Sequence, residues 1–307
     1  MSVATFDACV IAAFGRQLLV RDASGRALRA RPFGRELGAV CGDDVRCRND
    51  PRHGEVHVIE VLPRRTALYR SNARGGGEAV LANLSRLLVV IAPLPRPDPF
   101  VADRYLAAAE SAGIAATLVL NKAELGIDPT LRAQLDVYVA LGYECMTVSA
   151  ATGAGVDTLV AACVGHVAAL VGQSGVGKSS LIRQLVPDAE VEIGGLMRDE
   201  EGRHTTTVSR LYELAGGGGL IDSPGVRDFA PAVDRLDPRH LGFVEVARLA
   251  PGCRFLDCRH MREPSCAVRQ AVESGLMDAR RYESYRRLRR LAEDLTAIRG
   301  PKQKRDR

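Results

Sequence analysis

A glycine-rich run, GQSGVGKSS, occupies residues 172–180 and places Lys178 and Ser179 directly after its last glycine. Such glycines let backbone N–H groups surround a phosphate at the start of a helix. The lysine reaches the β- and γ-phosphates, where it would assist catalysis, and the serine hydroxyl is a Mg²⁺ ligand. The run predicts a nucleoside triphosphate site without indicating the base. Its expected nucleotide contacts are Gly172, Gln173, Ser174, Gly175, Val176, Gly177, Lys178, Ser179 and Ser180.

Two polar segments further along the chain could complete the phosphate side of this site. Asp222-Ser-Pro-Gly225 ends an apolar stretch, so the carboxylate could hold Mg²⁺ through water while the Gly225 amide meets the γ-phosphate. Residues 202–207 read GRHTTT, and a threonine there could complete the Mg²⁺ shell when triphosphate is bound. We favour Thr206, with either neighbouring threonine as an alternative. The structural alternative is a threonine-rich strand start.

A third group of residues indicates which base is bound. Asn121 and Lys122 are followed two residues later by Glu124, and Ser149-Ala150 follows a later apolar stretch. The amide would meet the base edge, the lysine stem would lie along the ring, and the carboxylate would accept from two N–H donors of guanine. Adenine presents a different donor pattern on that edge. These residues therefore predict GTP rather than ATP.

The order of these segments along the chain is unusual. The base-side residues 121–150 precede the phosphate loop, whereas in an ordinary small GTPase the phosphate loop comes first. The order predicts a circularly permuted domain, in which the same sheet is rebuilt from a chain with different ends. It also lets the segment at Asp222 run almost directly into the carboxyl-terminal region, to which the nucleotide state could be transmitted.

Four potential metal ligands lie within fourteen residues near the carboxyl terminus: Cys253, Cys258, His260 and Cys266. Three thiolates and one imidazole favour a closed, tetrahedral, structural zinc site. The surrounding segment has too few apolar residues to fold without such a metal. The other cysteines, in apolar or strand-like contexts, are interpreted as packing residues: Cys9, Cys41, Cys47, Cys145 and Cys163.

The elements that must position these residues follow from the apolar pattern. From residue 87, buried strands alternate with amphipathic helices, which predicts a parallel sheet covered on both faces. Each nucleotide motif falls at the end of a strand, where ligands of such sheets bind. An antiparallel pair is expected to turn at residues 216–219.

The two ends of the chain read differently from the centre. Strand-like runs recur at short intervals over the first seventy residues and predict a small five-stranded, oligonucleotide-binding-type barrel with an arginine-rich face. The region after residue 237 is short, helical and cysteine-bearing. We therefore expect a multidomain chain: an RNA-binding barrel at 1–80, a permuted nucleotide-binding α/β domain at 81–236, and a zinc-binding helical domain with a basic tail at 237–307.

Composition limits the possible partners. Net charge is +5, yet residues 1–85 carry +4, residues 86–252 carry −6 and residues 280–307 carry +7. Two basic ends around an acidic centre suit a chain that grips a polyanion such as RNA. No apolar run is long enough to span a membrane, and the amino terminus lacks the pattern of a signal peptide. We expect a cytoplasmic monomer without membrane contact.

Taken together, the motifs NKAE, SA, GQSGVGKS, GRHTTT and DSPG, with the barrel and C-x₄-C-x-H-x₅-C, resemble the ribosome small-subunit-dependent GTPase A family. The resemblance covers nearly the whole chain except the tail. It implies a GTPase that binds the small ribosomal subunit late in its maturation, is stimulated by it and leaves after hydrolysis. The barrel and zinc domain would then hold ribosomal RNA, and the cofactors would be GTP or GDP with Mg²⁺ and one structural Zn²⁺.

Two positions depart from the usual GTPase pattern. The base-reading motif ends in Glu124 where Asp is usual, so the longer side chain must reach guanine after a small shift or discriminate less. Val226 occupies the position where many GTPases place a water-orienting Gln, which predicts slow intrinsic turnover. His204 is our candidate for orienting water once RNA orders its loop, with an RNA contact or a turn cap as the alternative.

Two other function classes compete with the GTPase. A non-enzymatic RNA-binding assembly factor could hold nucleotide only as a structural element, but Lys178, Ser179 and Asp222 argue against it. An ATPase or a small-molecule kinase is disfavoured by Asn121-Lys122 and by the two basic ends.

Overall fold

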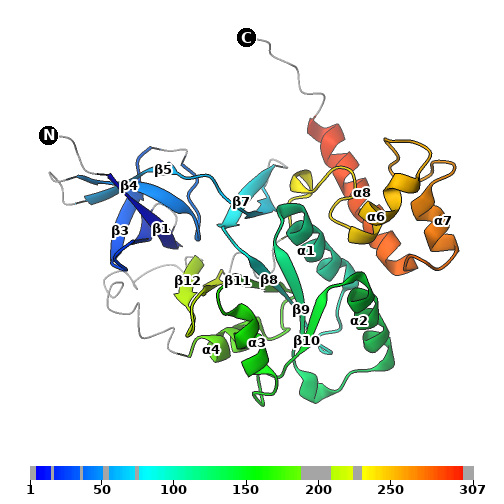
Figure 1. The fold of residues 1–307 in the computed structure, drawn as a ribbon, viewed down its shortest axis with the longest axis horizontal. Helices are drawn as coiled ribbons and strands as arrows, with labels where there is room; N and C mark the ends of the chain where they lie inside the picture. The colour runs from blue at the N-terminus through cyan, green and yellow to red at the C-terminus, as the bar shows by residue number, and fades with distance from the viewer. Residues whose placement is uncertain are drawn as a thin grey trace, which may run out of the picture.

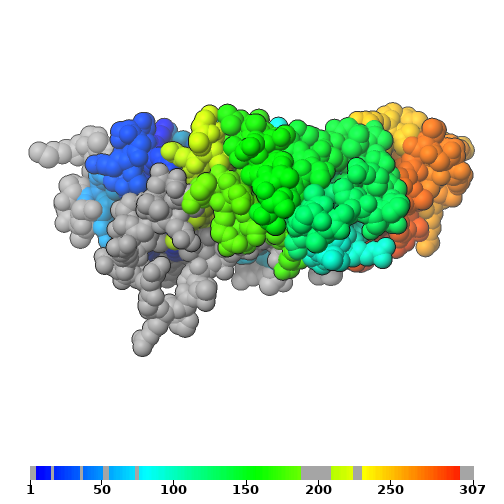
Figure 2. Space-filling view, turned by 90° about the horizontal axis from the view of Figure 1, so that it is seen from below, coloured from blue at the N-terminus to red at the C-terminus, as the bar shows by residue number. Residues whose placement is uncertain are grey.

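The computed structural model describes residues 5–14, 17–34, 37–50, 55–72, 76–187, 209–223 and 230–299. Three regions lie in a row along the long axis of the molecule (Figures 1 and 2). The amino-terminal barrel is at one end, the central α/β region is in the middle, and the carboxyl-terminal helices are at the other end. Of the helices in the described residues, none combines the length and apolar character that a membrane span requires.

The amino-terminal region is the predicted five-stranded barrel. Its strands are β1 (Thr5–Phe14), β2 (Gln17–Asp22), β3 (Ala27–Pro32), β4 (Asp44–Asp50) and β5 (Glu55–Val61). They follow the order β1-β2-β3-β5-β4, and β4 pairs back onto β1 to close the barrel. Inward positions alternate with outward ones, so that Val45 and Cys47 are buried between the half-exposed Arg46 and Arg48.

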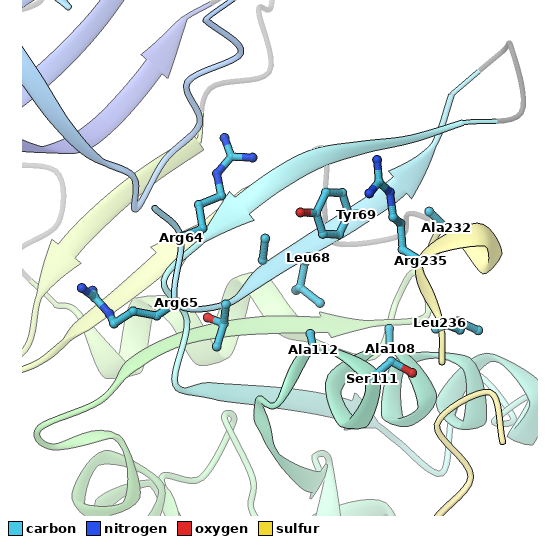
Figure 3. A pocket seen from close by; sticks show the side chains of 12 residues that line it. Arg64, Arg65, Leu68, Tyr69, Ala108, Ser111, Ala112, Ala232, Arg235 and Leu236 are labelled. Carbon is cyan, nitrogen blue, oxygen red and sulfur yellow. The ribbon is translucent and has the colours of Figure 1, made fainter. Parts of the chain in front are cut away.

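A separate hairpin joins the barrel to the central region. It consists of β6 (Ala67–Ser71) and β7 (Gly77–Ala82). Residues 230–232 run along β6: Ser71 N donates to Ala230 O (3.3 Å) and Ala232 N donates to Tyr69 O (2.9 Å). Figure 3 shows Arg235 beside the Tyr69 ring, 4.8 Å from its centroid, above α1. The chain that returns from Asp222 is therefore attached to the hairpin.

The central sheet has the order β10-β9-β8-β11-β13-β12. Its strands are β8 (Arg86–Ile91), β9 (Ala115–Leu120), β10 (Glu144–Thr147), β11 (Val167–Gly172), β12 (Ser209–Glu213) and β13 (Gly219–Asp222). In the sheet, β10, β9, β8, β11 and β13 are parallel to one another, while β12 and β13 form the predicted antiparallel pair. Beyond the prediction, β12 also pairs with β1 through Ala12 and Arg210, so that the barrel and the central sheet are continuous.

Helices cover both faces of this sheet, as predicted. They are α1 (Pro99–Ala112), α2 (Pro129–Leu141), α3 (Val156–Cys163) and α4 (Lys178–Leu185). Leu87 and Val89 of β8 belong to the same apolar core as residues of α1 and α2, whereas Leu88 and Val90 pack with residues of α3 and α4. Because a buried parallel strand must be apolar on both faces, it reads as the continuous run seen in the sequence.

The carboxyl-terminal region is mainly helical. Its helices are α6 (Val244–Leu249), α7 (Ala267–Glu273), α8 (Ala279–Arg299) and the short 3₁₀ turns η2 (Val233–Arg235) and η3 (Ala250–Gly252). Arg281 of α8 is 1% exposed and pairs with Asp103 of α1 (2.8 Å) and Glu245 of α6 (2.7 Å). This buried network fixes α8 against the central region.

Candidate nucleotide and zinc sites

The predicted nucleotide-binding segments meet at one edge of the central sheet. Residues 121–124 follow β9, residues 149–150 follow β10, the loop from Gly172 follows β11, and Asp222 ends β13. Parallel strands present their carboxyl ends on the same side, so the fold brings together segments that are far apart in the sequence.

The phosphate loop is shaped by glycines that no other residue could replace. A Cβ atom at Gly172 (φ 142°) would lie 2.2 Å from the carbonyl oxygen of Val90 on β8. One at Gly177 (φ 92°), which precedes α4, would lie 2.3 Å from Nδ2 of Asn121. Both backbone conformation and space therefore require glycine. A loop this close to its neighbours, ending at a helix start, fits a phosphate group.

Lys178 lies inside the phosphate loop rather than outside it. The side chain is buried, and Nζ donates to the carbonyl oxygens of Gly172 and Gln173, both at 2.7 Å. Ser179 and Ser180 follow it in the first turn of α4. The carbonyl groups of the loop thus hold the ammonium group close to the position where a phosphate would bind.

Asn121 connects the base side of the site to the phosphate side. Its side chain is buried; Nδ2 donates to Val176 O (2.9 Å), and Oδ1 accepts from Ala150 N (3.0 Å). Lys122 has φ 60°, and its Nζ donates to Gly175 O (2.7 Å) and Leu94 O (2.9 Å). The predicted base loops and the phosphate loop therefore form one hydrogen-bonded unit, a role of Asn121 that the sequence did not reveal.

The Glu124 carboxylate is exposed beside these loops, on the 3₁₀ turn η1 (Ala123–Leu125). A hydrogen bond from the Ser149 hydroxyl, with a second from its own backbone N–H, lowers the pKa of Glu124 below its usual value. Ser149 is itself buried. The carboxylate is thus kept ionised, the form that can accept from the N–H groups of guanine.

The predicted Mg²⁺ side is only partly described. Asp222 is half-buried at the end of β13, next to Ser223, whose Oγ lies 2.6 Å from Oγ of Ser209. His204, Thr206, Gly225 and Val226 lie outside the described residues.

A contact that the sequence did not suggest joins the phosphate loop to α1. The side-chain oxygen of Gln173 accepts from the backbone N–H of Asp98 (3.2 Å), and Asp98 caps α1 by accepting from Phe100 N (3.0 Å). The sequence around Gln173 could not predict this hydrogen bond, because its partner Asp98 lies 75 residues away in sequence.

The four predicted metal ligands come together. Their ligand atoms all lie within 4.8 Å of one another. Nδ1 of His260 is 3.4 Å from Sγ of Cys253 and 3.5 Å from Sγ of Cys266, and these sulfur atoms are 3.9 Å apart. Donors about 2.0–2.3 Å from a shared zinc ion are about 3.3–3.8 Å apart at tetrahedral angles. With Cys258, the donor set fits a structural zinc ion that leaves no coordination position open.

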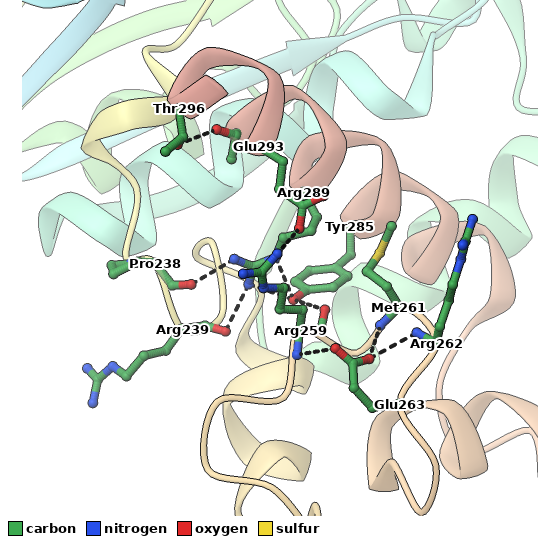
Figure 4. Close-up of polar contacts among 11 residues, drawn as sticks. Pro238, Arg239, Arg259, Met261, Arg262, Glu263, Tyr285, Arg289, Glu293 and Thr296 are labelled. Carbon is green, nitrogen blue, oxygen red and sulfur yellow. Dashed lines mark hydrogen bonds and ion pairs between the residues drawn. The ribbon is translucent and has the colours of Figure 1, made fainter. Parts of the chain in front are cut away.

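The backbone around this cluster is held by α8 (Figure 4). Tyr282 Oη donates to His260 O (2.7 Å), and Tyr285 Oη donates to Arg259 O (3.0 Å). The same helix holds the chain that arrives from the central region, because Arg289 donates to the carbonyl oxygens of Pro238 (2.8 Å) and Arg239 (3.1 Å). A shared helix therefore positions the metal cluster and the incoming segment together.

Comparisons with known proteins agree with this geometry. A family model described as RsgA GTPase matches residues 61–231. Proteins named small ribosomal subunit biogenesis GTPase RsgA from Azotobacter vinelandii and Pseudomonas aeruginosa are each 44% identical over 287 residues, covering 91% of this chain and 83% of theirs.

Two solved structures share the fold. The crystal structure of YjeQ from Thermotoga maritima matches with a TM-score of 0.71 and 25% identity, over 94% of this chain and 99% of that one. The structure of YloQ, described as a circularly permuted GTPase, matches with a TM-score of 0.69 and 22% identity, over 97% of each chain. The fold of this chain, including the permuted order of its central region, is therefore that of a known architecture.

Proposed function

The chain belongs to the RsgA GTPase family, and from that premise we propose that the small ribosomal subunit stimulates its GTP hydrolysis and that hydrolysis times its release. It is a GTP hydrolase of small-subunit biogenesis. The observation that carries the proposal is the bonded unit of Asn121, Val176 and Ala150, because it joins a guanine-type loop to a phosphate loop. The loop joined in this way carries the ionised Glu124, whose carboxylate can accept from the two N–H donors of guanine and would thus favour a guanosine nucleotide.

The nucleotide contacts are assigned as follows. The base would lie against Asn121, Lys122, Glu124, Ser149 and Ala150, and the phosphates against residues 172–180 and Gly225. Lys178 neutralises charge on the β- and γ-phosphates.

A magnesium ion would be held by Ser179, Thr206 and Asp222, and when bound it would offset the charge that develops on the phosphate oxygens. Zinc would be held by Cys253, Cys258, His260 and Cys266 and would serve only to fold its segment.

Water activation is assigned to His204. The residue after the DSPG motif is Val226, and an apolar side chain cannot orient water. Intrinsic hydrolysis should therefore be slow, and His204 would act once the subunit orders its segment. The alternative role for His204 is a direct contact with RNA.

Ribosomal RNA is proposed to contact both ends of the molecule. The barrel within 1–80 and the zinc region within 237–307 flank the GTPase region at 81–236, and both ends carry net positive charge. RNA affinity dominated by phosphate contacts follows from such a distribution. The protein is proposed to act as a cytoplasmic monomer.

The route by which hydrolysis could weaken this grip begins at the hydrogen bonds of residues 230–232. These residues follow the DSPG segment and pair with β6 of the hairpin, which lies next to the barrel. Further along, Arg289 holds Pro238 and Arg239 against α8. A shift of the DSPG segment would therefore be transmitted to both of the ends that are proposed to bind RNA.

The test is GTP hydrolysis by the purified protein with and without isolated small subunits, with ATP as the control nucleotide. We expect slow turnover alone and an increase of at least about tenfold with subunits, because RNA-dependent ordering would supply the missing water-orienting group. Equal turnover with and without subunits, or equal use of ATP, would contradict the proposal and favour an RNA-binding assembly factor with a structural nucleotide.

A further inference from the structure

One outward face of the barrel carries a row of basic side chains around an exposed aromatic ring. Arg31 on β3 is the register partner of His57 on β5, and His57 is the register partner of Arg48 on β4. Phe33, just after β3, is 58% exposed although it is one of the largest apolar side chains of the barrel. Figure 1 shows β3, β4 and β5 side by side at the far end of the molecule.

The ring of Phe33 is held in a defined position. Its backbone N–H donates to Val58 O (2.8 Å), and the His57 ring meets it edge-on at a centroid distance of 5.8 Å. The guanidinium carbon of Arg48 lies 4.8 Å from the centroid of Phe33. Arg48 therefore packs on the ring, and among the described residues no Asp or Glu forms a salt bridge with it.

The neighbouring row on the same face has a different charge balance. Arg46, two residues before Arg48 on β4, is bonded to Asp7 and Glu60, both at 3.1 Å. Near Phe33, Glu55 lies 3.5 Å from Arg31 and 3.8 Å from Nε2 of His57. Among the described residues, Arg48 thus offers a cation beside Phe33 that no carboxylate neutralises through a salt bridge, whereas Arg46 is paired with two.

We propose that Phe33, His57, Arg48 and Arg31 form a platform on which an unpaired RNA base stacks, with the adjoining phosphates held by the two arginines. The proposal rests on the proposed function, because it specifies how the barrel would hold ribosomal RNA. An exposed aromatic ring beside cations is the arrangement by which proteins bind single-stranded nucleic acid, since every base offers a flat face and every nucleotide offers a phosphate.

The same chemistry excludes a base-paired ligand. In a duplex the faces of the bases are stacked on one another, so they are not offered to Phe33. An acidic peptide would meet the arginines but would leave the ring without a planar partner. An unpaired loop or bulge satisfies both the ring and the charges.

The test measures binding of the full-length protein to a short, labelled single-stranded RNA of mixed sequence. Phe33→Leu keeps an apolar side chain but removes the flat face, so we expect affinity to fall about tenfold. Phe33→Trp should retain or increase affinity. Arg48→Ala should lower the slope of log affinity against log salt by about 0.7, which corresponds to one phosphate contact. Arg46→Ala is the matched control and should leave affinity and salt slope unchanged.

Several outcomes would overturn the platform. Equal affinity of wild type and Phe33→Leu would do so, as would equal losses for Phe33→Leu and Phe33→Trp, or for Arg46→Ala and Arg48→Ala. Tighter binding of a matched duplex would also overturn it. If Phe33→Leu bound RNA normally but bound subunits poorly, the surface would belong to a ribosomal protein instead. A wild-type protein whose GTP hydrolysis ignores subunits would refute the proposed function, whereas the RNA titration judges the platform by itself.

Discussion

The side-chain amide of Asn121 donates to the backbone carbonyl of Val176 across 2.9 Å, although 55 residues separate them in sequence. In the same position the amide oxygen accepts from Ala150 N (3.0 Å). One side chain therefore fixes the distance between the loop that reads the base and the loop that surrounds the phosphates. A nucleotide must bridge these two loops, so its affinity depends on their spacing being set in advance.

Asn121→Ala should weaken binding of both GTP and GDP by at least about tenfold. It should also lower the free energy of unfolding by about 1–3 kcal/mol, because the Ala150 N–H and the Val176 carbonyl lose a buried partner. Nucleotide titration and urea unfolding would measure the two effects. The control is Gln184→Ala, which removes only a 3.3 Å bond from an exposed side chain to Ala150 O. Similar losses for both variants would contradict the bridging role.

Nucleotide affinity should depend on pH through Glu124. The Ser149 hydroxyl lowers the pKa of this carboxyl, so in the wild type the charge that accepts from guanine persists to lower pH than usual. Ser149→Ala should return the pKa towards its ordinary value, and GDP affinity should then begin to fall at a higher pH. GDP titrations between about pH 4 and 7 would measure the shift.

The same experiment needs a reference without a titrating group. Glu124→Gln cannot ionise, so it should show weak GDP binding with little pH dependence and should admit ATP more readily. Glu124→Asp should keep the wild-type profile if the shorter carboxylate still reaches Ser149. An unchanged profile in Ser149→Ala would show that the hydroxyl does not set the charge state of Glu124.

Local patterns are enough to indicate the segments that meet at the candidate sites. The glycines at 172, 175 and 177 reflect the backbone conformation of one short loop, and the four zinc ligands fall within one short segment. Each motif can therefore be recognised within a short stretch of sequence. The strands and helices that position them alternate in a regular apolar pattern, and they were predicted for the same reason. The exception is α3 (Val156–Cys163), whose short, mostly apolar run did not stand out as a helix.

Long-range contacts could not be predicted. The pairing of Ala12 with Arg210 joins strands that belong to different regions, and the sequence of neither strand predicts this pairing. Likewise, Asn121 was expected to contact the base, but its bonds to Val176 and Ala150 depend on how three loops approach one another. Such contacts are fixed by tertiary packing, which a single sequence does not reveal.

His204→Ala should leave GTP affinity unchanged and abolish the stimulation of hydrolysis by subunits. The expected loss is about a hundredfold or more in the stimulated rate, as for removal of other groups that orient the attacking water. Single-turnover hydrolysis with and without subunits would measure it. His166→Ala is a suitable control because His166 bonds Ser85 at the opposite edge of the sheet. Stimulated turnover equal to the wild type would leave His204 only a role in contacting RNA.

Removal of zinc should unfold the metal-binding segment without preventing GTP binding. Cys258→Ser removes one zinc ligand, and a strong chelator removes the metal itself. Zinc binding contributes on the order of 10 kcal/mol to folding of such a site, and the few apolar residues of this segment cannot supply that stabilisation. We expect loss of bound zinc, proteolytic cleavage near residues 253–266, and loss of subunit binding. Cys145→Ser, which lies away from the cluster, should retain zinc and protease resistance. A chelated protein that still resisted proteolysis there would contradict the structural role.

Arg281 should contribute more to stability than any exposed arginine of the same helix. It is 1% exposed and holds Asp103 of α1 and Glu245 of α6 at 2.8 and 2.7 Å. Its removal would leave the buried Glu245 without the cation that holds it, whereas Asp103 would keep the neighbouring Arg280 at 2.8 Å. Arg281→Met should therefore lower the free energy of unfolding by about 3–5 kcal/mol. Arg290→Ala, which is exposed like its partner Glu283, should lower it by about 1 kcal/mol or less. Urea unfolding followed by tyrosine fluorescence would compare them. The double variant that also carries Glu245→Gln should recover part of the loss, because it removes the carboxylate that Arg281→Met leaves without its cation. If the double variant were no more stable than Arg281→Met, the loss would not come from the unpaired carboxylate of Glu245.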